Sequence, residues 1–554
     1  MMRVVRRGVL VTGAVIVLLG LTLAQKQKPL TVPGASETAL KEALDSYRKG
    51  AFDQAVAKYN EVLKADPQLA AAHAGLARCY VRQDKVNDAA EVLQKALAEK
   101  PSDPELKVAQ GEVFFREGRI YDAEKNFVDV INSGSMNARA YLGLARISSA
   151  ITMYAREYKM IVRAHELDSS DPDIRKLWLS TLPPAQRIKA LEDYLGQAFG
   201  DDEDQHNGML SYLAMMKARQ ASARRTCRLV SNVTSTETDL ARLMKDAHIL
   251  RGYGLPVVVN NQKSKLRLDT GAGGILINRK LAERAGIQRA ADIHTWGIGN
   301  KSDPNSYIGF ADSIRIGSLE FHDCPVEVFE GRSLVDEEGL IGADVFSKFL
   351  IEIDFPAEKL RLSALPPRPG EAPTKAALAT DEDDDADAEA EAGKTTTTTV
   401  PKEQQPPKYY DRYIAPEMNS YARVYRFGHA LLVPTKVNDV QGKLFLIDSG
   451  AFDNIITPET AKEVTKVHGA DWLKVKGLSG EVNKVYTTDE LTLEFGHLRQ
   501  KKALVAIDMS RLSRHIGTEV SGTLGFAMLG LLRVRLDYRD ALVDFEYIDP
   551  TKKH

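Results

Sequence analysis

The sequence predicts a multidomain protein in which an all-α helical-repeat solenoid is followed by two all-β lobes. Two observations predict this fold class. Small and large apolar residues recur every 34 positions in the first third of the chain, and an Asp-Thr/Ser-Gly-Ala turn occurs twice in the remainder, at Asp269 and at Asp448. A long acidic and Thr-rich segment separates the two turns. With 554 residues, the chain is long enough for three domains.

Residues 1–24 have the pattern of a secretory signal segment. Arginines at positions 3, 6 and 7 precede an almost wholly apolar stretch at 8–23, and Thr22-Leu23-Ala24 resembles a small-residue cleavage site. The apolar stretch is shorter than the roughly 20 residues of a membrane-spanning helix. We therefore expect a cleaved signal peptide and a periplasmic or secreted protein. The alternative is an uncleaved anchor, which would be the protein's sole contact with a membrane.

The 34-residue period runs through residues 36–198. The recurring positions are Ala55, Ala89 and Ala123, and Tyr59, Leu93 and Phe127. This period resembles that of tetratricopeptide repeats, in which small residues let paired helices approach and large residues fill the gaps. A fourth, looser unit follows, and Pro172 onward predicts a terminal helix pair. The resemblance implies a scaffold that binds a peptide or a partner protein.

Residues 199–249 are expected to be a connector with a helix at about 209–224 and no chemistry of its own. Cys227 lies in this segment, and Cys79 and Cys324 lie in other regions, a distribution that predicts no disulfide framework. The composition is 44% hydrophobic and 27% charged, as in ordinary globular proteins. The net charge of −2 does not indicate a nucleic-acid partner.

The two Asp turns belong to two copies of one β-rich module, at 250–365 and 409–550. An offset of 179 places Asp269 on Asp448 and Leu276 on Ile455, and an offset of 183 places Gly342 on Gly525. Alternating apolar residues predict the strands of each copy. The strands of the first copy are 255–259, 265–268, 350–354 and 359–362, with a short helical stretch at 344–348. Those of the second are 433–437, 443–447, 534–537 and 542–545.

The turn, a glycine-bearing hairpin and a late hydrophobic-hydrophobic-Gly element together resemble the lobe of a retropepsin-like (retroviral-type) aspartic protease. The resemblance implies that Asp269 and Asp448 are catalytic. It also implies that their neighbours support the catalytic turns, with Thr270 and Ser449 bracing them across the interface between the lobes. These supporting residues are Thr270, Gly271, Ser449 and Gly450. The candidate flap residues are Trp296, Gly297 and Gly299 in the first copy and Gly477 and Gly480 in the second.

The chemistry explains why two copies are needed. Two carboxylates about 3 Å apart cannot both ionise, so the pair shares one proton and titrates as a unit. The ionised member takes a proton from a water molecule, while the protonated member polarises the scissile carbonyl. This reaction needs neither a cofactor nor a metal ion, and we expect none.

Residues 366–408 are expected to be a disordered linker, because their Pro-rich, acidic and Thr-rich stretches cannot form a core. A flexible chain of this length spans roughly 35 Å, so the two lobes can pair within one molecule. The alternative is that each lobe pairs with its twin in another molecule.

The two copies differ immediately after the turn. The first continues with Gly273 and Gly274, whereas the second has Phe452 and Asp453. This difference leaves open a second lobe that pairs structurally without supporting catalysis. The sequence therefore predicts a peptide hydrolase, with a scaffold that binds peptides without cutting them as the alternative.

Overall fold

The computed structural model describes most of the chain. The described residues are 34–197, 199–201, 203–222, 227–231, 233, 235–244, 248–295, 297, 305–330, 337–369, 410–477 and 480–549. The expected signal segment at 1–24 and residues 370–408 of the expected linker lie outside this set.

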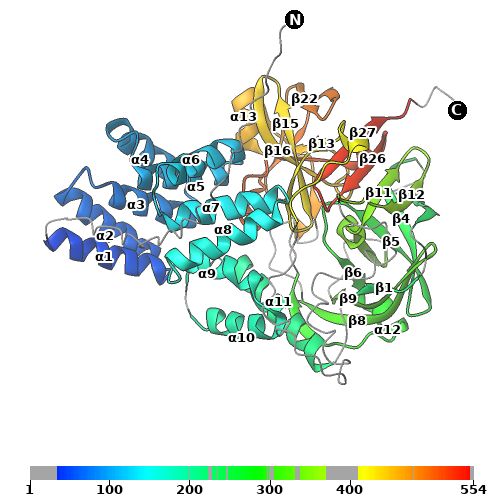
Figure 1. Cartoon of the computed structure of the whole chain (residues 1–554). Coiled ribbons are helices and arrows are strands. Elements are labelled where there is room, and N and C mark those ends of the chain that lie inside the picture. The colour runs from blue at the N-terminus through cyan, green and yellow to red at the C-terminus, as the bar shows by residue number, and fades with distance from the viewer. Residues whose placement is uncertain are drawn as a thin grey trace, which may run out of the picture.

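The first part of the chain is a stack of paired helices (Figure 1). The four pairs are α1 (Gly34–Arg48) with α2 (Phe52–Ala65), α3 (Ala70–Arg82) with α4 (Val86–Glu99), α5 (Pro104–Arg116) with α6 (Ile120–Asn132), and α7 (Ala138–Ala150) with α8 (Tyr154–Leu167). The Asp103 carboxylate caps α5 by accepting hydrogen bonds from the amides of Glu105 and Leu106. The predicted apolar stripes are confirmed as core, since Ala55, Ala89 and Ala123 are fully buried.

Glycine sets the distance between neighbouring helices of the array. The ring of Phe127 on α6 is buried and lies against Gly111 on α5 and Gly143 on α7. A Cβ on Gly111 would be 2.6 Å from a ring carbon, and a Cβ on Gly143 would overlap the ring. The helices can therefore pack this closely only if both positions lack a side chain.

Four further helical elements follow the array. They are α9 (Pro172–Trp178), η1 (Leu179–Thr181), α10 (Pro184–Leu195) and α11 (Glu203–Ala221). The helix expected at about 209–224 thus begins six residues earlier. None of the helices in the described ranges combines the length and the apolar character that crossing a membrane requires.

The β-rich part of the chain contains two large sheets whose central strands have the same order. In the described residues the first sheet runs β1-β9-β6-β10-β5-β4-β8-β7, and the second runs β18-β21-β24-β17-β25-β16-β15-β22-β23. The first sheet contains β1 (Arg228–Leu229), β4 (Leu250–Val259), β5 (Gln262–Asp269), β6 (Ile275–Asn278), β7 (Ala291–His294), β8 (Asn305–Ile316), β9 (Leu319–Phe329) and β10 (Gly339–Gly342). The second contains β15 (Ala430–Val437), β16 (Val440–Ile447), β17 (Ile455–Ile456), β18 (Val467–Gly469), β21 (Val485–Thr488), β22 (Leu491–Phe495), β23 (Leu498–Lys502), β24 (Val505–Ile507) and β25 (Gly522–Leu524).

The central strands of the two sheets correspond one to one. In the first sheet β10 is parallel to β5 and antiparallel to β6, and β6 is parallel to β9. In the second, β25 is parallel to β16 and antiparallel to β17, and β17 is parallel to β24. The duplication read from the sequence is therefore present in the topology. We call the part built around β5 the first half and the part built around β16 the second half.

A third sheet joins the two halves. Its central hairpins are β11 (Phe349–Asp354) with β12 (Lys359–Ala364) from the first half, and β26 (Leu532–Asp537) with β27 (Leu542–Tyr547) from the second. β11 pairs antiparallel with β26, so that Glu352 lies opposite Arg535 and Asp354 opposite Arg533. Both pairs are ion pairs with N–O distances of 2.8 Å. Backbone hydrogen bonds and alternating charges thus fix the register between the halves.

Three sequence-based expectations need correction. The segment expected to be a plain connector supplies strands to both neighbouring sheets: β1 pairs with β9, β2 (Thr236–Asp239) with β12, and β3 (Ala241–Met244) with β4. Two of the cysteines are also paired, since Cys227 and Cys324 form a disulfide. The pairing of β1 with β9 brings these two cysteines together across 97 residues of sequence. The helical stretch expected at 344–348 is a 3-10 turn, η2 (Ala343–Phe346).

The helical array packs directly on the second half. One apolar cluster contains Phe115 and Val130 of the array together with Leu444 and Val520 of the second half. At its edge the Thr518 hydroxyl donates to the Phe115 carbonyl at 2.6 Å, and both groups are buried. In Figure 1 the second half accordingly lies beside α6 and α7. The array and the second half therefore share one apolar core.

We expect Gly143→Ala to lower the free energy of unfolding by about 1–3 kcal/mol, because the added methyl group overlaps the Phe127 ring. Urea denaturation followed by circular dichroism measures the change. Gly208→Ala is the matched control, since Gly208 also lies in a helix but has nothing within 4 Å of its Cβ position. That variant gains up to about 1 kcal/mol. Equal effects of the two substitutions would contradict the packing argument.

Candidate active site

The two Asp turns occupy the same place in each half. Asp269 is the last residue of β5 and lies opposite Gly342 on the parallel strand β10. Asp448 follows the last residue of β16, and its amide donates to the Leu524 carbonyl on the parallel strand β25 at 3.0 Å. Each aspartate therefore lies at the carboxyl end of a central strand, where the chain turns sharply.

The third residue of each turn lies against the aspartate of the other. A Cβ on Gly271 would be 2.6 Å from Asp448 Cγ, and a Cβ on Gly450 would be 2.5 Å from Asp269 Oδ1. No side chain fits at either glycine. The two predicted catalytic aspartates are thus brought together within one chain, each carboxylate over the opposite turn.

Thr270 and Ser449 connect the turns by reciprocal hydrogen bonds. The Thr270 amide donates to Ser449 Oγ at 3.1 Å, and the Ser449 amide donates to Thr270 Oγ1 at 2.9 Å. Each hydroxyl then donates to the opposite strand, Thr270 to the Ile447 carbonyl at 2.9 Å and Ser449 to the Leu268 carbonyl at 3.0 Å. Both side chains are 2% exposed, so these hydrogen bonds are shielded from water.

The environments of the two carboxyl groups differ. Asp269 is half-buried and accepts one backbone hydrogen bond, from the Gly271 amide at 3.0 Å. Asp448 is 7% exposed and accepts two, from the amides of Gly450 and Ala451, both at 2.9 Å. Burial and the neighbouring Asp269 raise the pKa of Asp448 to about 7, although the two amides and Arg267 act in the opposite direction. Asp448 is therefore the member that holds a proton more strongly than an ordinary carboxyl group.

Sequence reasoning missed several residues around the turns. Asp344 of η2 accepts hydrogen bonds from the Gly274 amide at 3.0 and 3.1 Å, which fixes the chain after the first turn. His429 of the second half lies against Gly273, where a Cβ would be 2.7 Å from the ring nitrogen Nδ1. Arg267 donates to the Gly450 carbonyl of the opposite turn at 2.9 Å. Only Arg267 had a sequence signal, because strand periodicity places it on the same face as Asp269.

The candidate flap residues are described only in part. Gly477 and Gly480 lie opposite each other in a hairpin of β19 (Lys476–Gly477) and β20 (Gly480–Glu481). Trp296 and Gly299 lie outside the described residues, and Gly297 belongs to no helix or strand. Across the described part of the chain, no three His, Cys, Asp or Glu side chains are grouped so as to hold a metal ion.

Two family models match the chain. Residues 255–345 match a model described as aspartyl protease, and residues 46–112 match one described as tetratricopeptide repeat. The DNA damage-inducible protein 1 of Chaetomium globosum is 34% identical over 108 residues. This match covers 19% of the present chain and 23% of that protein, so the chain spans less than a quarter of the relative's length.

Solved structures show the same two similarities. A thermophilic tetratricopeptide-repeat protein of Thermus thermophilus is 20% identical, covers 34% of this chain and 98% of its own, and has a TM-score of 0.25. A retropepsin-like aspartic protease from Rickettsia conorii is 27% identical, covers 24% of this chain and 94% of its own, and has a TM-score of 0.18. The chain is thus similar to tetratricopeptide repeats over residues 46–112 and to aspartyl proteases over residues 255–345.

Proposed function

We propose that the protein is an aspartic endopeptidase whose active site is made of one aspartate from each of two retropepsin-like lobes in the same chain. The observation that carries the proposal is the pair of reciprocal hydrogen bonds between Thr270 and Ser449. These bonds bring Asp269 and Asp448 to a common axis, as a two-carboxylate mechanism requires. The aspartyl protease model at 255–345 supports this assignment for the first lobe.

The unequal burial of the two carboxyl groups suggests their roles. Asp269, which is half-buried, is the ionised base and takes a proton from a water molecule held between the pair. Asp448, which is buried, holds the shared proton and gives it to the oxygen of the scissile carbonyl. The water oxygen bonds to the carbonyl carbon, giving a neutral tetrahedral diol. Asp269 then gives its proton to the amide nitrogen while Asp448 takes a proton from one hydroxyl of the diol, so the C–N bond breaks, the amine leaves, and both carboxyl groups return to their starting states.

A second function is binding of peptides without cleavage. It is supported by Phe452, which directly follows the second turn where the first lobe has a glycine, and which is 50% exposed. A large apolar side chain at this position provides contact area for an apolar peptide without contributing to catalysis. The cleavage experiment below distinguishes the two functions.

The repeat array is the proposed site of a protein partner, by analogy with its fold. One charged cluster inside the array is already paired within the protein, because Arg139 forms ion pairs with Glu112, Asp171 and Asp173 at 2.5–2.9 Å.

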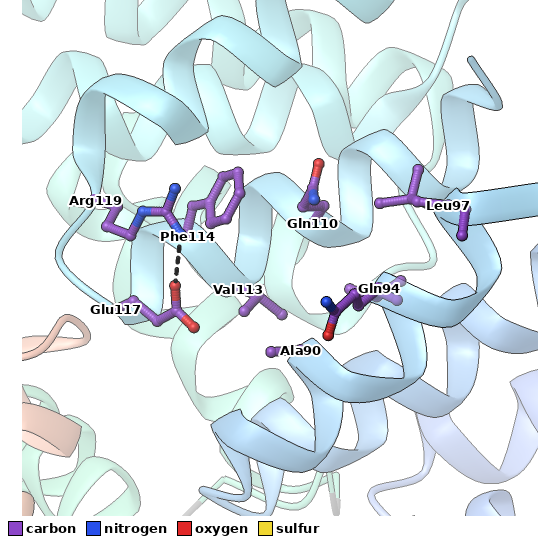
Figure 2. A pocket seen from close by; sticks show the side chains of 10 residues that line it. Ala90, Gln94, Leu97, Gln110, Val113, Phe114, Glu117 and Arg119 are labelled. Atoms are coloured by element: carbon purple, nitrogen blue, oxygen red, sulfur yellow. Dashed lines mark hydrogen bonds and ion pairs between the residues drawn. The ribbon is translucent and has the colours of Figure 1, made fainter. Parts of the chain in front are cut away.

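Another part of the array surface is free for a partner. A groove of about 470 Å³ lies between α4 and α5, with Leu97, Val113 and Phe114 along it and Glu117 and Arg119 at one end (Figure 2).

Export from the cytoplasm is part of the proposal. Its basis is the signal-like pattern of residues 1–24. The Cys227–Cys324 disulfide supports it, because disulfides persist mainly in oxidising compartments such as the periplasm and the cell exterior.

We expect the full chain to cleave a mixed peptide library, and we expect Asp269→Asn and Asp448→Asn each to lower the rate by at least about a thousandfold. Either substitution removes one of the two carboxyl groups that exchange the proton. Mass spectrometry of the products measures the rate. Asp453→Asn is the matched control, since Asp453 forms an ion pair with Lys502 at 2.6 Å and has no role in the proposed reaction. A folded wild-type protein that cleaves nothing between pH 3 and 8 favours the binding function.

The rate should fall as the pH rises through about 7. The pKa of Asp448 is raised to about 7, so the shared proton is lost above this pH and the pair can no longer protonate the carbonyl oxygen. We expect kcat/KM to decline about tenfold per pH unit above about pH 7, which forms the basic limb of the pH profile. A rate that stays constant up to pH 9 would contradict the assignment of Asp448 as the proton donor.

A further inference from the structure

Arg267 breaks the symmetry of the two lobes at the catalytic turns. On β5 the side chains of Leu266 and Leu268 are buried in the core, so Arg267 and Asp269 share the opposite face. The matching position of the second lobe is Leu446, which is 2% exposed and belongs to the apolar cluster that contacts the array. At this strand position, therefore, the first lobe has a cation and the second has a buried leucine.

The guanidinium of Arg267 reaches across to the other lobe. Its Nη2 donates to the Gly450 carbonyl at 2.9 Å and to the Arg251 carbonyl on β4 at 3.0 Å. The amide of the same Gly450 donates to Asp448 Oδ1 at 2.9 Å. Gly450 thus contacts Arg267 through its carbonyl and Asp448 through its amide. A shift of the Arg267 side chain would therefore move the backbone that holds the Asp448 carboxylate.

Arg267 is also a cation that acts on Asp448. Its charge lowers the pKa of Asp448, against burial and the charge of Asp269. Other titratable and charged groups lie near the turns: Asp344 faces His429 and Arg426, and Tyr538 faces Asp344, Arg426 and Asp269. Asp344, His429, Arg426 and Tyr538 all lie outside β5, so a substitution at Arg267 leaves these groups in place.

We propose that Arg267 is a positioning residue for the carboxylate pair, holding the second turn through the Gly450 carbonyl and stabilising negative charge on the pair by its own charge. This inference rests on the proposed protease function. A pair that shares one proton carries one negative charge, and one half-buried guanidinium beside it compensates that charge. The site is then close to neutral when it closes on a peptide, which lowers the cost of removing water from it.

The test uses Arg267→Met, which removes the charge and keeps the length of the side chain, and Arg267→Lys, which keeps the charge. Lys265→Met is the matched control, because Lys265 lies two residues earlier on the same face of β5 and is exposed. Two readouts are measured for each variant. They are the pH dependence of kcat/KM and the pH dependence of the melting temperature without substrate.

We expect Arg267→Met to move the basic limb of the kcat/KM profile to higher pH by about one unit, because the cation no longer favours ionisation of Asp448. Arg267→Lys and Lys265→Met should leave the limb in place. A role in folding alone would lower the rate at all pH values without moving the limb, and that result would overturn the proposal.

The melting temperature gives a readout that needs no activity. Because the pKa of Asp448 is raised by folding, the protonated form stabilises the fold at low pH, and this stabilisation is lost as the pH rises toward about 7. In Arg267→Met the loss of stability with rising pH should be larger than in wild type and should extend to higher pH. Adding Asp448→Asn to both proteins should remove the difference between them. If wild-type protein cleaves nothing but the melting curves behave in this way, the protease function fails and the role of Arg267 stands. Identical melting curves for wild type and Arg267→Met would overturn the role of Arg267.

Discussion

The reciprocal hydrogen bonds between Thr270 and Ser449 are the interaction on which the site depends. Each hydroxyl accepts from the backbone of the opposite turn and donates to a carbonyl of the opposite strand. Because both side chains are buried, losing either hydroxyl leaves donors and acceptors without partners, at a cost of about 1–3 kcal/mol for each group. The same geometry requires glycine at 271 and 450, since each faces the other turn's carboxylate. The pair of aspartates therefore exists only while the two lobes are closed on each other.

Two larger interfaces keep the lobes in this arrangement. The sheet formed by β11 and β26 joins them by backbone pairing and by the ion pairs of Arg533 and Arg535 with Asp354 and Glu352. On the far side of the second lobe, the helical array buries Phe115 against Leu444 and Val520. The array thus shares an apolar core with the second half.

Patterns within short stretches predicted much of this arrangement. The strand pair around Asn260-Asn261 and both Asp turns could be predicted because each depends on neighbours a few residues away, and the apolar stripes of the array could be predicted because they repeat every 34 residues. The Cys227–Cys324 disulfide, the three short strands β1, β2 and β3, and the contact of Arg267 with Gly450 could not. The disulfide, β1, β2 and Arg267 each depend on a partner far away in the sequence, and strands of two to four residues, such as β1, β2 and β3, carry too little periodicity to be recognised. The docking of the array was missed for the same reason, since buried Leu444 and Leu446 look like ordinary strand residues.

The account requires that both aspartates of a working site come from one molecule. Mixing inactive Asp269→Asn with inactive Asp448→Asn tests this requirement most directly, because a site shared between two molecules would combine the intact Asp448 of one with the intact Asp269 of the other. The account predicts that the equimolar mixture stays as inactive as either variant alone at every protein concentration. Recovery of activity that grows with concentration would contradict it and would place the pair of carboxylates between two chains.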